Sequence, residues 1–383
     1  MIEFKNVMDI LKPVKILYYF PEEAANMHQW QRIHFFDELA QNNIFIEVFN
    51  PLNYIDIAEA QNVLVDFVKK SKHRFDLFFT AVGDNFLTPE TVLEIKNTGL
   101  QTLLICFDNL HAPFMHRKLS PHFDLTWLTS METEYIFKKW GTNTIFLPYA
   151  ANPFFFKPSY KPEISSVGFI GTPYGTRLKK LKQLALHDLP VSIYSNSFFG
   201  TGNSEKKTKR TNQEKLKHIF ELLTFPIGRK ILYSELINRF QKSEDIYENL
   251  LKNERIHLFQ SVTFQDMAEL YSSFAISLGI TDVRNTYLLN NPVLKLHLRT
   301  FEIPMSGGLQ IINHTDEIAS YFEENKEVIL YKSDEELISK AKFYMQDSQI
   351  KNRQKMKVAA RKRAESEHTW TNRFNEVFQK LGL

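Results

Sequence analysis

Short apolar stretches alternate with segments of helical periodicity along the first half of the chain. Six stretches have the length and residue types of buried strands, at residues 16–20, 44–49, 77–80, 103–107, 125–129 and 145–147. Between them, Ile33, Phe36 and Ala40 recur at helical spacing, and Thr88 followed by Pro89 is typical of a helix start. Six strands with crossing helices predict one doubly wound α/β domain with a parallel sheet.

A proline-rich stretch at residues 148–162 shows neither periodicity and is typical of a connection between domains. The alternation then starts again, with predicted strands at residues 167–170, 191–194, 274–280, 309–312 and 328–331. An interruption near residues 195–253 indicates an insertion. Further along, Ser333 and Glu336 have the spacing of a capping box, which predicts another helix start.

These patterns predict a chain of two domains. We expect the first over residues 1–158 and the second over residues 159–368, the latter carrying the insertion. The last residues, 369–383, are amphipathic and are expected to form a helix that packs back toward the first domain.

Composition narrows the class of protein. The 383 residues are 43% hydrophobic with a net charge of only +3, so the chain lacks the basic excess of a dedicated nucleic-acid binder. The single cysteine, Cys106, lies in an apolar run and is expected to be a buried, inert thiol. The sequence shows no signal-peptide pattern and no apolar stretch long enough to span a bilayer. We therefore expect a cytoplasmic protein, attached to a membrane at most peripherally.

One segment of the second predicted domain combines charge with glycine. Arg299 and Glu302 are three residues apart and share one helical face, and Gly307 and Gly308 follow where that helix gives way to the next strand. A guanidinium and a carboxylate placed in this way could hold a phosphate and a sugar hydroxyl. The alternative is an ion pair on a solvated helix face.

Several motifs in this order resemble those of a known family. They are Arg299-x-Phe301-Glu302-x4-Gly307, Phe322-x4-Glu327-Val328, Glu367-His368-Thr369-Trp370-x2-Arg373, Phe107-Asp108, Leu147-Pro148-Tyr149, and Val167-Gly168-Phe169-Ile170-Gly171 followed by Arg177. The sequence resembles the CgeB-like spore-maturation-protein glycosyltransferases, whose C-terminal domain is of the group 1 glycosyl transferase type. The resemblance covers nearly the whole chain except the insertion.

The resemblance implies a GT-B architecture, in which two doubly wound Rossmann-like domains face each other across a cleft. It also implies a nucleoside diphosphate sugar as donor, bound by the C-terminal domain, and hexosyl transfer without an obligatory metal ion or further cofactor. The acceptor, a glycan, a lipid-linked molecule or a protein, would approach from the N-terminal domain. The implied setting is the synthesis of bacterial surface polysaccharide or glycoconjugates.

The resemblance also implies roles for individual residues on the donor side. Glu302 matches the carboxylate that hydrogen-bonds the ribose hydroxyls in related enzymes. Many retaining relatives carry a second glutamate eight positions earlier, where this chain has Leu294, so retention and inversion both remain open.

The diphosphate needs positive charge, and Arg299, Lys295 and Arg177 are the candidates because guanidinium forks and ammonium groups bind phosphate oxygens. Gly171 would let its loop close on the donor. Since three lysines follow Arg177 closely, the alternative for Arg177 is a solvated helix face.

Acceptor-side chemistry calls for a base that removes a proton from the attacking hydroxyl. Asp84, Asp108 and His111 follow predicted strands, and catalytic groups collect at the carboxyl ends of parallel strands. Capping or turn formation is the alternative role for these residues. A retaining enzyme would need no such base.

The insertion places basic residues next to an apolar run. Six basic residues between positions 206 and 217 precede the apolar residues: Lys206, Lys207, Lys209, Arg210, Lys215 and Lys217. Such pairing suits an anionic lipid surface, so we expect a peripheral membrane contact through Lys206–Lys217. A solvated arm beside a packed helix is the alternative.

Two other functions share the expected fold. A phosphorylase or sugar-nucleotide epimerase would use the same cleft with phosphate or water in place of the acceptor. A non-catalytic nucleotide- or sugar-binding module would keep the donor site without the chemistry.

Overall fold

The computed structural model describes residues 13–23, 26–71, 73–159, 161–199, 211–240 and 252–383. The chain divides into two compact units. The first unit comprises Met1–Pro148 together with Trp370–Leu383, and the second comprises Tyr149–Thr369.

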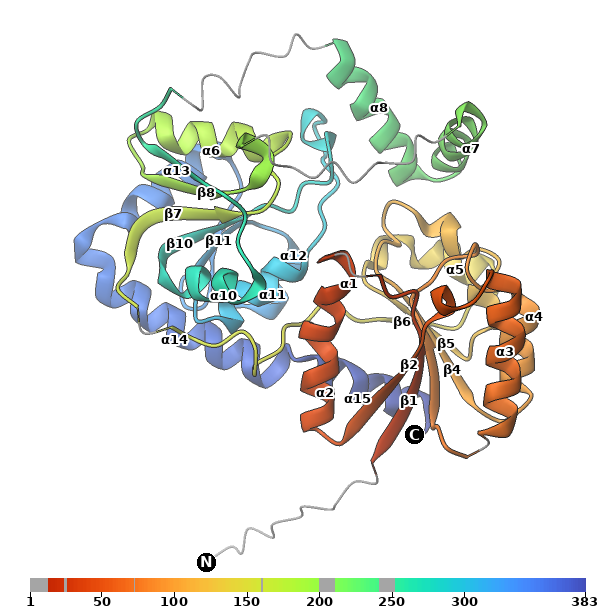
Figure 1. Ribbon diagram of the computed structural model, residues 1–383. Coiled ribbons are helices and arrows are strands. Elements are labelled where there is room, and N and C mark those ends of the chain that lie inside the picture. Colours follow the sequence, from red (N-terminus) through yellow and green to blue (C-terminus); the bar gives the residue numbers. More distant parts are fainter. Residues whose placement is uncertain (1–12, 24–25, 72, 160, 200–210, 241–251) are drawn as a thin grey trace, which may run out of the picture. The chain divides into compact units, whose positions relative to one another are not determined.

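The first unit contains a six-stranded parallel sheet, which confirms the predicted doubly wound fold. Its strands, in the order β2-β1-β3-β4-β5-β6, are β1 Val14–Tyr19, β2 Ile44–Phe49, β3 Leu77–Thr80, β4 Gln101–Cys106, β5 Leu125–Leu128 and β6 Thr144–Phe146. The α-helices of the unit are α1 Asn26–Gln31, α2 Asp37–Gln41, α3 Ile57–Lys70, α4 Pro89–Lys96, α5 Glu134–Lys139 and α15 Trp370–Leu381. Figure 1 shows α3 and α4 on one face of the sheet and α2 and α15 on the other.

Two local features of this unit agree with the sequence patterns. The hydroxyl of Thr88 accepts a hydrogen bond from the backbone N–H of Thr91, which confirms the predicted start of α4. Cys106 is buried at the end of β4, as expected. Burial raises the pKa of its thiol well above the ordinary value, so Cys106 stays protonated and unreactive at neutral pH.

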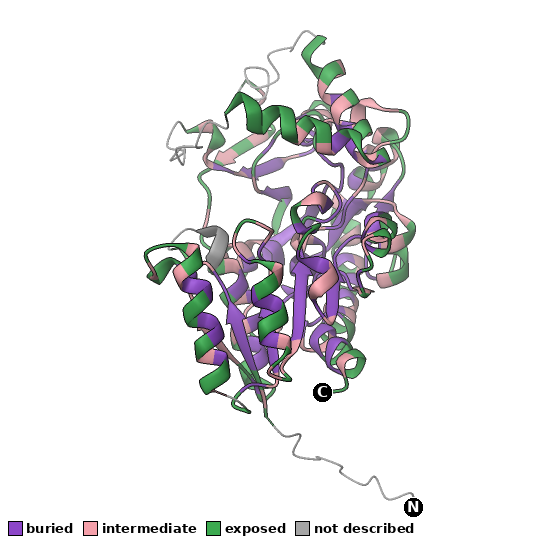
Figure 2. Ribbon diagram, turned by 90° about the vertical axis from the view of Figure 1, so that its right-hand side faces the viewer, coloured by how far each residue is buried: buried purple, intermediate pink, exposed green. Residues whose placement is uncertain are grey.

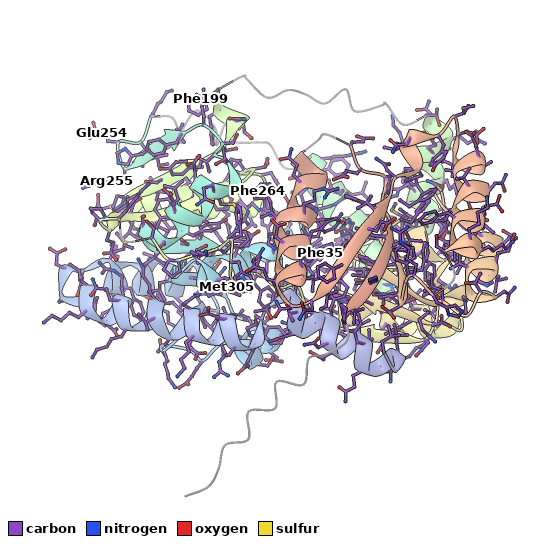
Figure 3. The ribbon with its side chains drawn as sticks, turned by 60° about the horizontal axis from the view of Figure 1, so that its bottom comes forward. Phe35, Phe199, Glu254, Arg255, Phe264 and Met305 are labelled. Carbon is purple, nitrogen blue, oxygen red and sulfur yellow. The ribbon has the colours of Figure 1, made fainter. Side chains whose placement is uncertain are left out.

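The C-terminal helix α15 belongs to the first unit. The indole Nε1 of Trp370 donates to Nδ1 of His34 at 3.2 Å, and the backbone N–H of Thr371 donates to Glu38 at 2.6 Å. Phe35, labelled in Figure 3, lies in the π-helix η1 Arg32–Phe36, with its ring centre 5.3 Å from that of Trp370. Aromatic packing and buried hydrogen bonds therefore hold the last helix against the start of the chain.

The second unit also contains a six-stranded parallel sheet. Its strands, in the order β12-β11-β10-β7-β8-β9, are β7 Ile164–Ile170, β8 Val191–Tyr194, β9 Ile256–Phe259, β10 Phe274–Gly279, β11 Gln310–Asn313 and β12 Ile329–Tyr331. The helices that pack on it are α6 Thr176–Leu186, α10 Phe264–Ser273, α11 Leu298–Met305, α12 Asp316–Tyr321, α13 Asp334–Met345 and α14 Ile350–Glu367. In Figure 1, α6 and α13 cover one face, whereas α10, α11 and α14 cover the other.

Strand β9 is absent from the predicted strands. It forms an edge of the sheet and pairs only with β8, and its side chains alternate between half-buried and exposed. This four-residue edge strand directly follows the predicted insertion, where no strand of the sheet was expected.

The predicted helix start at Ser333 is confirmed. Its hydroxyl accepts from the N–H of Glu336, whereas the carboxylate of Glu336 accepts from the N–H of Lys332 at 2.7 Å rather than from that of Ser333. In a standard capping box, the Glu336 carboxylate would accept from the N–H of Ser333; here it accepts from the N–H of the preceding residue.

The insertion forms two packed helices over its described residues, α7 Asn212–Leu223 and α8 Pro226–Phe240. Gly228 permits their close approach, because a Cβ there would lie 2.1 Å from the carbonyl oxygen of Leu222. Figure 2 shows that most strands of both sheets are buried, whereas the outer faces of many helices are exposed. Four of the predicted basic residues lie outside the described residues: Lys206, Lys207, Lys209 and Arg210.

Candidate donor and acceptor sites

The order of the strands locates the candidate site in the second unit. β7 is the first strand of the sheet, β8 lies on one side of it and β10 lies on the other. In doubly wound sheets, ligands bind beside the carboxyl ends of the strands where the chain changes direction in this way. The loop after β7, the start of α6, the segment after β10 and the start of α11 all follow these strand ends.

Arg299 lies in the first turn of α11. Reciprocal hydrogen bonds between His297 and Thr300 begin this helix. Nη2 of Arg299 donates to the carbonyl oxygen of Ile170, the last residue of β7, at 2.8 Å. Its guanidinium carbon lies 5.3 Å from the ring centre of Phe169. These contacts fix the guanidinium at the end of β7, beside Gly171.

Arg177 reaches the same loop from the first turn of α6. It is buried, and its Nη1 donates to the carbonyl oxygen of Thr172 at 2.9 Å. The ring of Tyr174 lies 4.3 Å from its guanidinium carbon. Burial and, to a smaller extent, the nearby charge of Arg299 together lower the pKa of Arg177 to about 10. The alternative role for Arg177, a charge on a solvated helix face, therefore does not hold, because its side chain is buried.

The two arginines form the core of an anion site. Among the described residues, Nε of Arg177 and Nε of Arg299 are buried and have no hydrogen-bond acceptor. The first turn of α6 contains no acidic residue, and Gly175 ends the loop without a side-chain cap. Two buried guanidiniums at the positive end of a helix dipole favour an anion that carries more than one negative charge.

Glu302 and Tyr271 lie next to this pair. Glu302 is buried one turn beyond Arg299 on α11. Burial raises the pKa of Tyr271 on α10 to about 12, the charge of Arg299 opposes this rise and that of Glu302 adds to it. Glu302, Arg299 and Tyr271 are therefore electrostatic neighbours, so the carboxylate faces the sheet rather than solvent.

Lys295 lies in the segment between β10 and α11. Its backbone N–H donates to the carbonyl oxygen of Thr281 at 2.8 Å. Its side chain is buried, with Nζ 5.6 Å from the ring centre of Tyr149. The structure therefore places Lys295 on the same sheet edge as the arginines, packed against an aromatic ring.

Gly307 and Gly308 lie at the other end of α11, which is eight residues or roughly 12 Å long. They precede β11 and so lie at the amino edge of the sheet. A Cβ at Gly308 would lie 2.4 Å from the carbonyl oxygen of Tyr271, and one at Gly307 would lie 3.1 Å from Pro158. The two glycines permit a tight turn, and the structure does not bring them to the arginine pair.

Asp282, which the sequence patterns did not single out, lies after β10. It is buried, and one of its carboxylate oxygens has no hydrogen-bond donor among the described residues. Burial raises its pKa, while the charges of Lys180 and Arg177 oppose the rise. Lys180 also donates to Asp334 at 2.7 Å. The position of Asp282 just past a predicted strand was the available sequence signal.

Asp84 holds a loop in the first unit. Its carboxylate accepts from the backbone N–H groups of Lys118 and Leu119 at 3.1 and 3.2 Å, and its own N–H donates to the carbonyl oxygen of Met115 at 2.8 Å. Burial raises its pKa, and these hydrogen bonds oppose the rise. This geometry is that of a structural clamp between two loops.

Asp108 and His111 lie together after β4. Nε2 of His111 is 4.0 Å from Oδ1 of Asp108, whose side chain is 67% exposed. His116 is buried nearby, where burial lowers its pKa to about 4 and the charge of Asp108 partly opposes this effect. Asp108 is thus accessible to solvent, whereas His116 is neutral at physiological pH.

The architecture defines a class of protein: the chain has the fold of GT-B glycosyltransferases. HepE from Anabaena, solved in complex with UDP, is 14% identical with a TM-score of 0.57, over 96% of this chain and 99% of HepE. A glycosyltransferase from Rickettsia africae is 11% identical with a TM-score of 0.56, over 96% and 98% of the two chains. Sucrose-phosphate synthase from Thermosynechococcus elongatus is 12% identical with a TM-score of 0.54, over 97% and 99%.

The sequence profile of the family described as glycosyl transferase-like matches residues 232–379. This match includes Lys295, Arg299 and Glu302, but not Arg177. No curated protein sequence matches the chain. The match agrees with the glycosyltransferase class of the resemblance, and the narrower CgeB-like relationship stays a prediction.

Proposed function

We propose that this protein is a glycosyltransferase that takes a hexose from a nucleoside diphosphate sugar held by the second unit. The observation that supports it best is the pair of buried guanidiniums, Arg177 and Arg299, next to the start of α6. Backbone carbonyls hold both groups in place while each leaves a buried Nε–H without an acceptor among the described residues.

A diphosphate fits this arrangement in charge and in hydrogen bonding. Hydrogen bonds to charged groups contribute about 1.5–3 kcal/mol each, so two guanidinium forks can supply much of the affinity for a nucleotide. An anion between them would also relieve the repulsion that lowers the pKa of Arg177. Since these arginines supply positive charge, we propose transfer without an obligatory metal ion.

Glu302 is proposed to accept hydrogen bonds from the ribose hydroxyls. Its burial one turn beyond Arg299 on α11 supports this role, since it places the carboxylate beside the proposed phosphate site. Lys295 is proposed as a further contact to the phosphates, and Gly171 as the residue that permits backbone approach. Gly307 and Gly308 support the site only through the turn that positions α11.

The acceptor is proposed to be a hydroxyl group of a glycan, a lipid-linked molecule or a protein, in the assembly of bacterial surface glycans. His111, with Asp108 as its neighbour, is the proposed proton acceptor, because histidine is the side chain that most often serves as a general base. Glycosidic bond formation would release the nucleoside diphosphate as the anionic leaving group that the arginines stabilise.

Thermal unfolding with ligands tests the donor site. We expect pyrophosphate and one nucleoside diphosphate from a panel of UDP, GDP and CDP to raise Tm, since a ligand at 100 times its Kd adds about 2.7 kcal/mol of stability. Arg177→Ala and Arg299→Ala should remove both shifts. Arg255→Ala is the matched control, because Arg255 is an exposed arginine of the same unit (Figure 3).

Product analysis with the preferred donor tests the reaction itself. Transfer of the sugar to an added acceptor supports the proposal. Release of an epimerised sugar, or of a sugar phosphate in phosphate buffer, would indicate an epimerase or a phosphorylase. Donor binding without turnover on any acceptor would indicate a non-catalytic binding module.

A further inference from the structure

Helix α7 carries an apolar stripe that the fold leaves uncovered. Leu216, Ile219, Phe220 and Leu223 follow the spacing that aligns side chains along one face of a helix, and Phe220 is 68% exposed. Only Leu222 of this helix is buried. The stripe is therefore separate from the face by which α7 packs within its unit.

The charges of α7 are arranged around this stripe. Helical geometry places Lys215 and Lys217 roughly a quarter turn away on either side of it, and both are exposed. The same geometry places Glu214 and Glu221 on the opposite side of the helix. Apolar side chains flanked by lysines, with acidic residues facing away, are typical of a helix that lies in the interface of an anionic bilayer.

The partner helix α8 adds a second exposed stripe. Tyr233, Leu236 and Phe240 align on one face, opposite Ile231, which packs inward; Phe240 is 87% exposed. Because Gly228 locks α8 against α7, the two helices present these side chains as one folded element. Exposed apolar side chains that line up along a helix mark an interaction surface.

We propose that the α7–α8 element docks on an anionic lipid surface, with the stripe of α7 in the interface and Lys215 and Lys217 at the headgroup phosphates. The arrangement of charge selects this occupant. A second copy docked on the same stripe would offer these lysines no complementary charge, because Glu214 and Glu221 of α7 face away from it. No helix among the residues described in the structure is long and apolar enough to cross a membrane, so the contact is peripheral.

Co-sedimentation with vesicles tests the proposal. We compare vesicles of phosphatidylcholine alone with vesicles that also contain phosphatidylglycerol, and expect the full chain to sediment with the anionic vesicles only. Leu216→Ser with Phe220→Ser should lower the partition coefficient at least about tenfold, because two large apolar side chains leave the interface. Lys215→Glu with Lys217→Glu should lower it about fivefold or more per lysine.

The matched control is Phe343→Ser on α13, a 47% exposed phenylalanine of the same unit that should sediment as the wild type. Since the substituted residues are exposed, circular dichroism and Tm should stay unchanged. Equal sedimentation with neutral and anionic vesicles, no sedimentation at all, or wild-type behaviour of the Leu216 and Phe220 variant would overturn the proposal. A lipid-independent dimer that this variant abolishes would overturn it in favour of self-association.

Discussion

The backbone of Gly171 lies against the guanidinium of Arg299, so closely that a Cβ on Gly171 would be 2.7 Å from Nη2. One residue follows β7 and the other begins α11, and the hydrogen bond from Arg299 to Ile170 brings them together. Gly171 also has a φ of 137°, a value that side chains disfavour. The position of the arginine therefore depends on the absence of a side chain at residue 171.

Gly171→Ala should weaken nucleotide binding at least about tenfold. The added methyl group would displace the Arg299 guanidinium and strain the loop, and one lost charged hydrogen bond corresponds to about 1.5–3 kcal/mol. Isothermal titration with the preferred nucleoside diphosphate measures the effect. Gly141→Ala is the control, because Gly141 has a positive φ of 80° but no atoms near its Cβ position, so strain lowers Tm without loss of affinity. Unchanged affinity of the Gly171 variant would contradict the placement of Arg299 at the donor.

The sequence predicts most of the fold because both sheets are parallel and buried. Strands β2, β3 and β8 have the predicted bounds, and the others predicted differ by a few residues at their ends. Buried parallel strands are continuous apolar runs, and these are prominent in a sequence. β9 shows the limit of this pattern, because it is a short, half-solvated edge strand that directly follows the insertion.

The candidate site is harder to predict, because burial and edge position arise only in the folded chain. Arg177 and its lysine neighbours look alike in sequence, yet Arg177 is buried under Tyr174 and Lys180 beside Tyr331, whereas Lys179 is exposed. Gly307 and Gly308 stand near Arg299 in sequence, but a helix of eight residues places them at the opposite edge of the sheet. Their proximity in sequence therefore predicted a single cluster, whereas helix α11 separates the two glycines from Arg299.

Glu302→Gln should separate recognition of the ribose from recognition of the phosphates. We expect the affinity for the nucleoside diphosphate to fall about tenfold, because a charged acceptor is lost, and the affinity for pyrophosphate to stay the same. Parallel titrations of both ligands into the two proteins measure this. Equal losses for both ligands would instead place Glu302 among the groups that hold the phosphates or the fold.

His111→Gln should lower turnover but not donor binding. If His111 accepts the proton of the attacking hydroxyl, its variant should lose about 10²–10⁴ in kcat with unchanged donor affinity. Turnover assays measure this effect. Full activity of the His111 variant would favour a mechanism without an acceptor-side base.

Asp84→Asn should lower stability. The substitution removes the charge that two backbone N–H groups contact, and should lower the free energy of unfolding by about 1–3 kcal/mol. Denaturant titrations measure this effect.

Glu38 should make stability depend on pH. Its buried carboxylate accepts two hydrogen bonds from Thr371, at 2.6 and 2.7 Å, but burial still raises its pKa from 4.5 to about 7. Below pH 4.5 the carboxyl is protonated in the folded and unfolded chains alike. Between pH 4.5 and 7 only the folded chain keeps the proton, so its contribution to stability declines as pH rises, by up to about 3 kcal/mol.

Glu38→Gln cannot ionise, so it should lose less stability than the wild type between pH 5 and pH 8. Urea denaturation at both pH values measures the difference. Both proteins contain His116, so its protonation contributes equally to the two stability changes and cancels in the comparison. Glu94→Gln, at an exposed salt bridge with Lys69, is the control and should follow the wild type. If Glu38→Gln also followed the wild type, the carboxylate would be ionised in the fold at pH 5, and its hydrogen bonds with Thr371 would outweigh its burial.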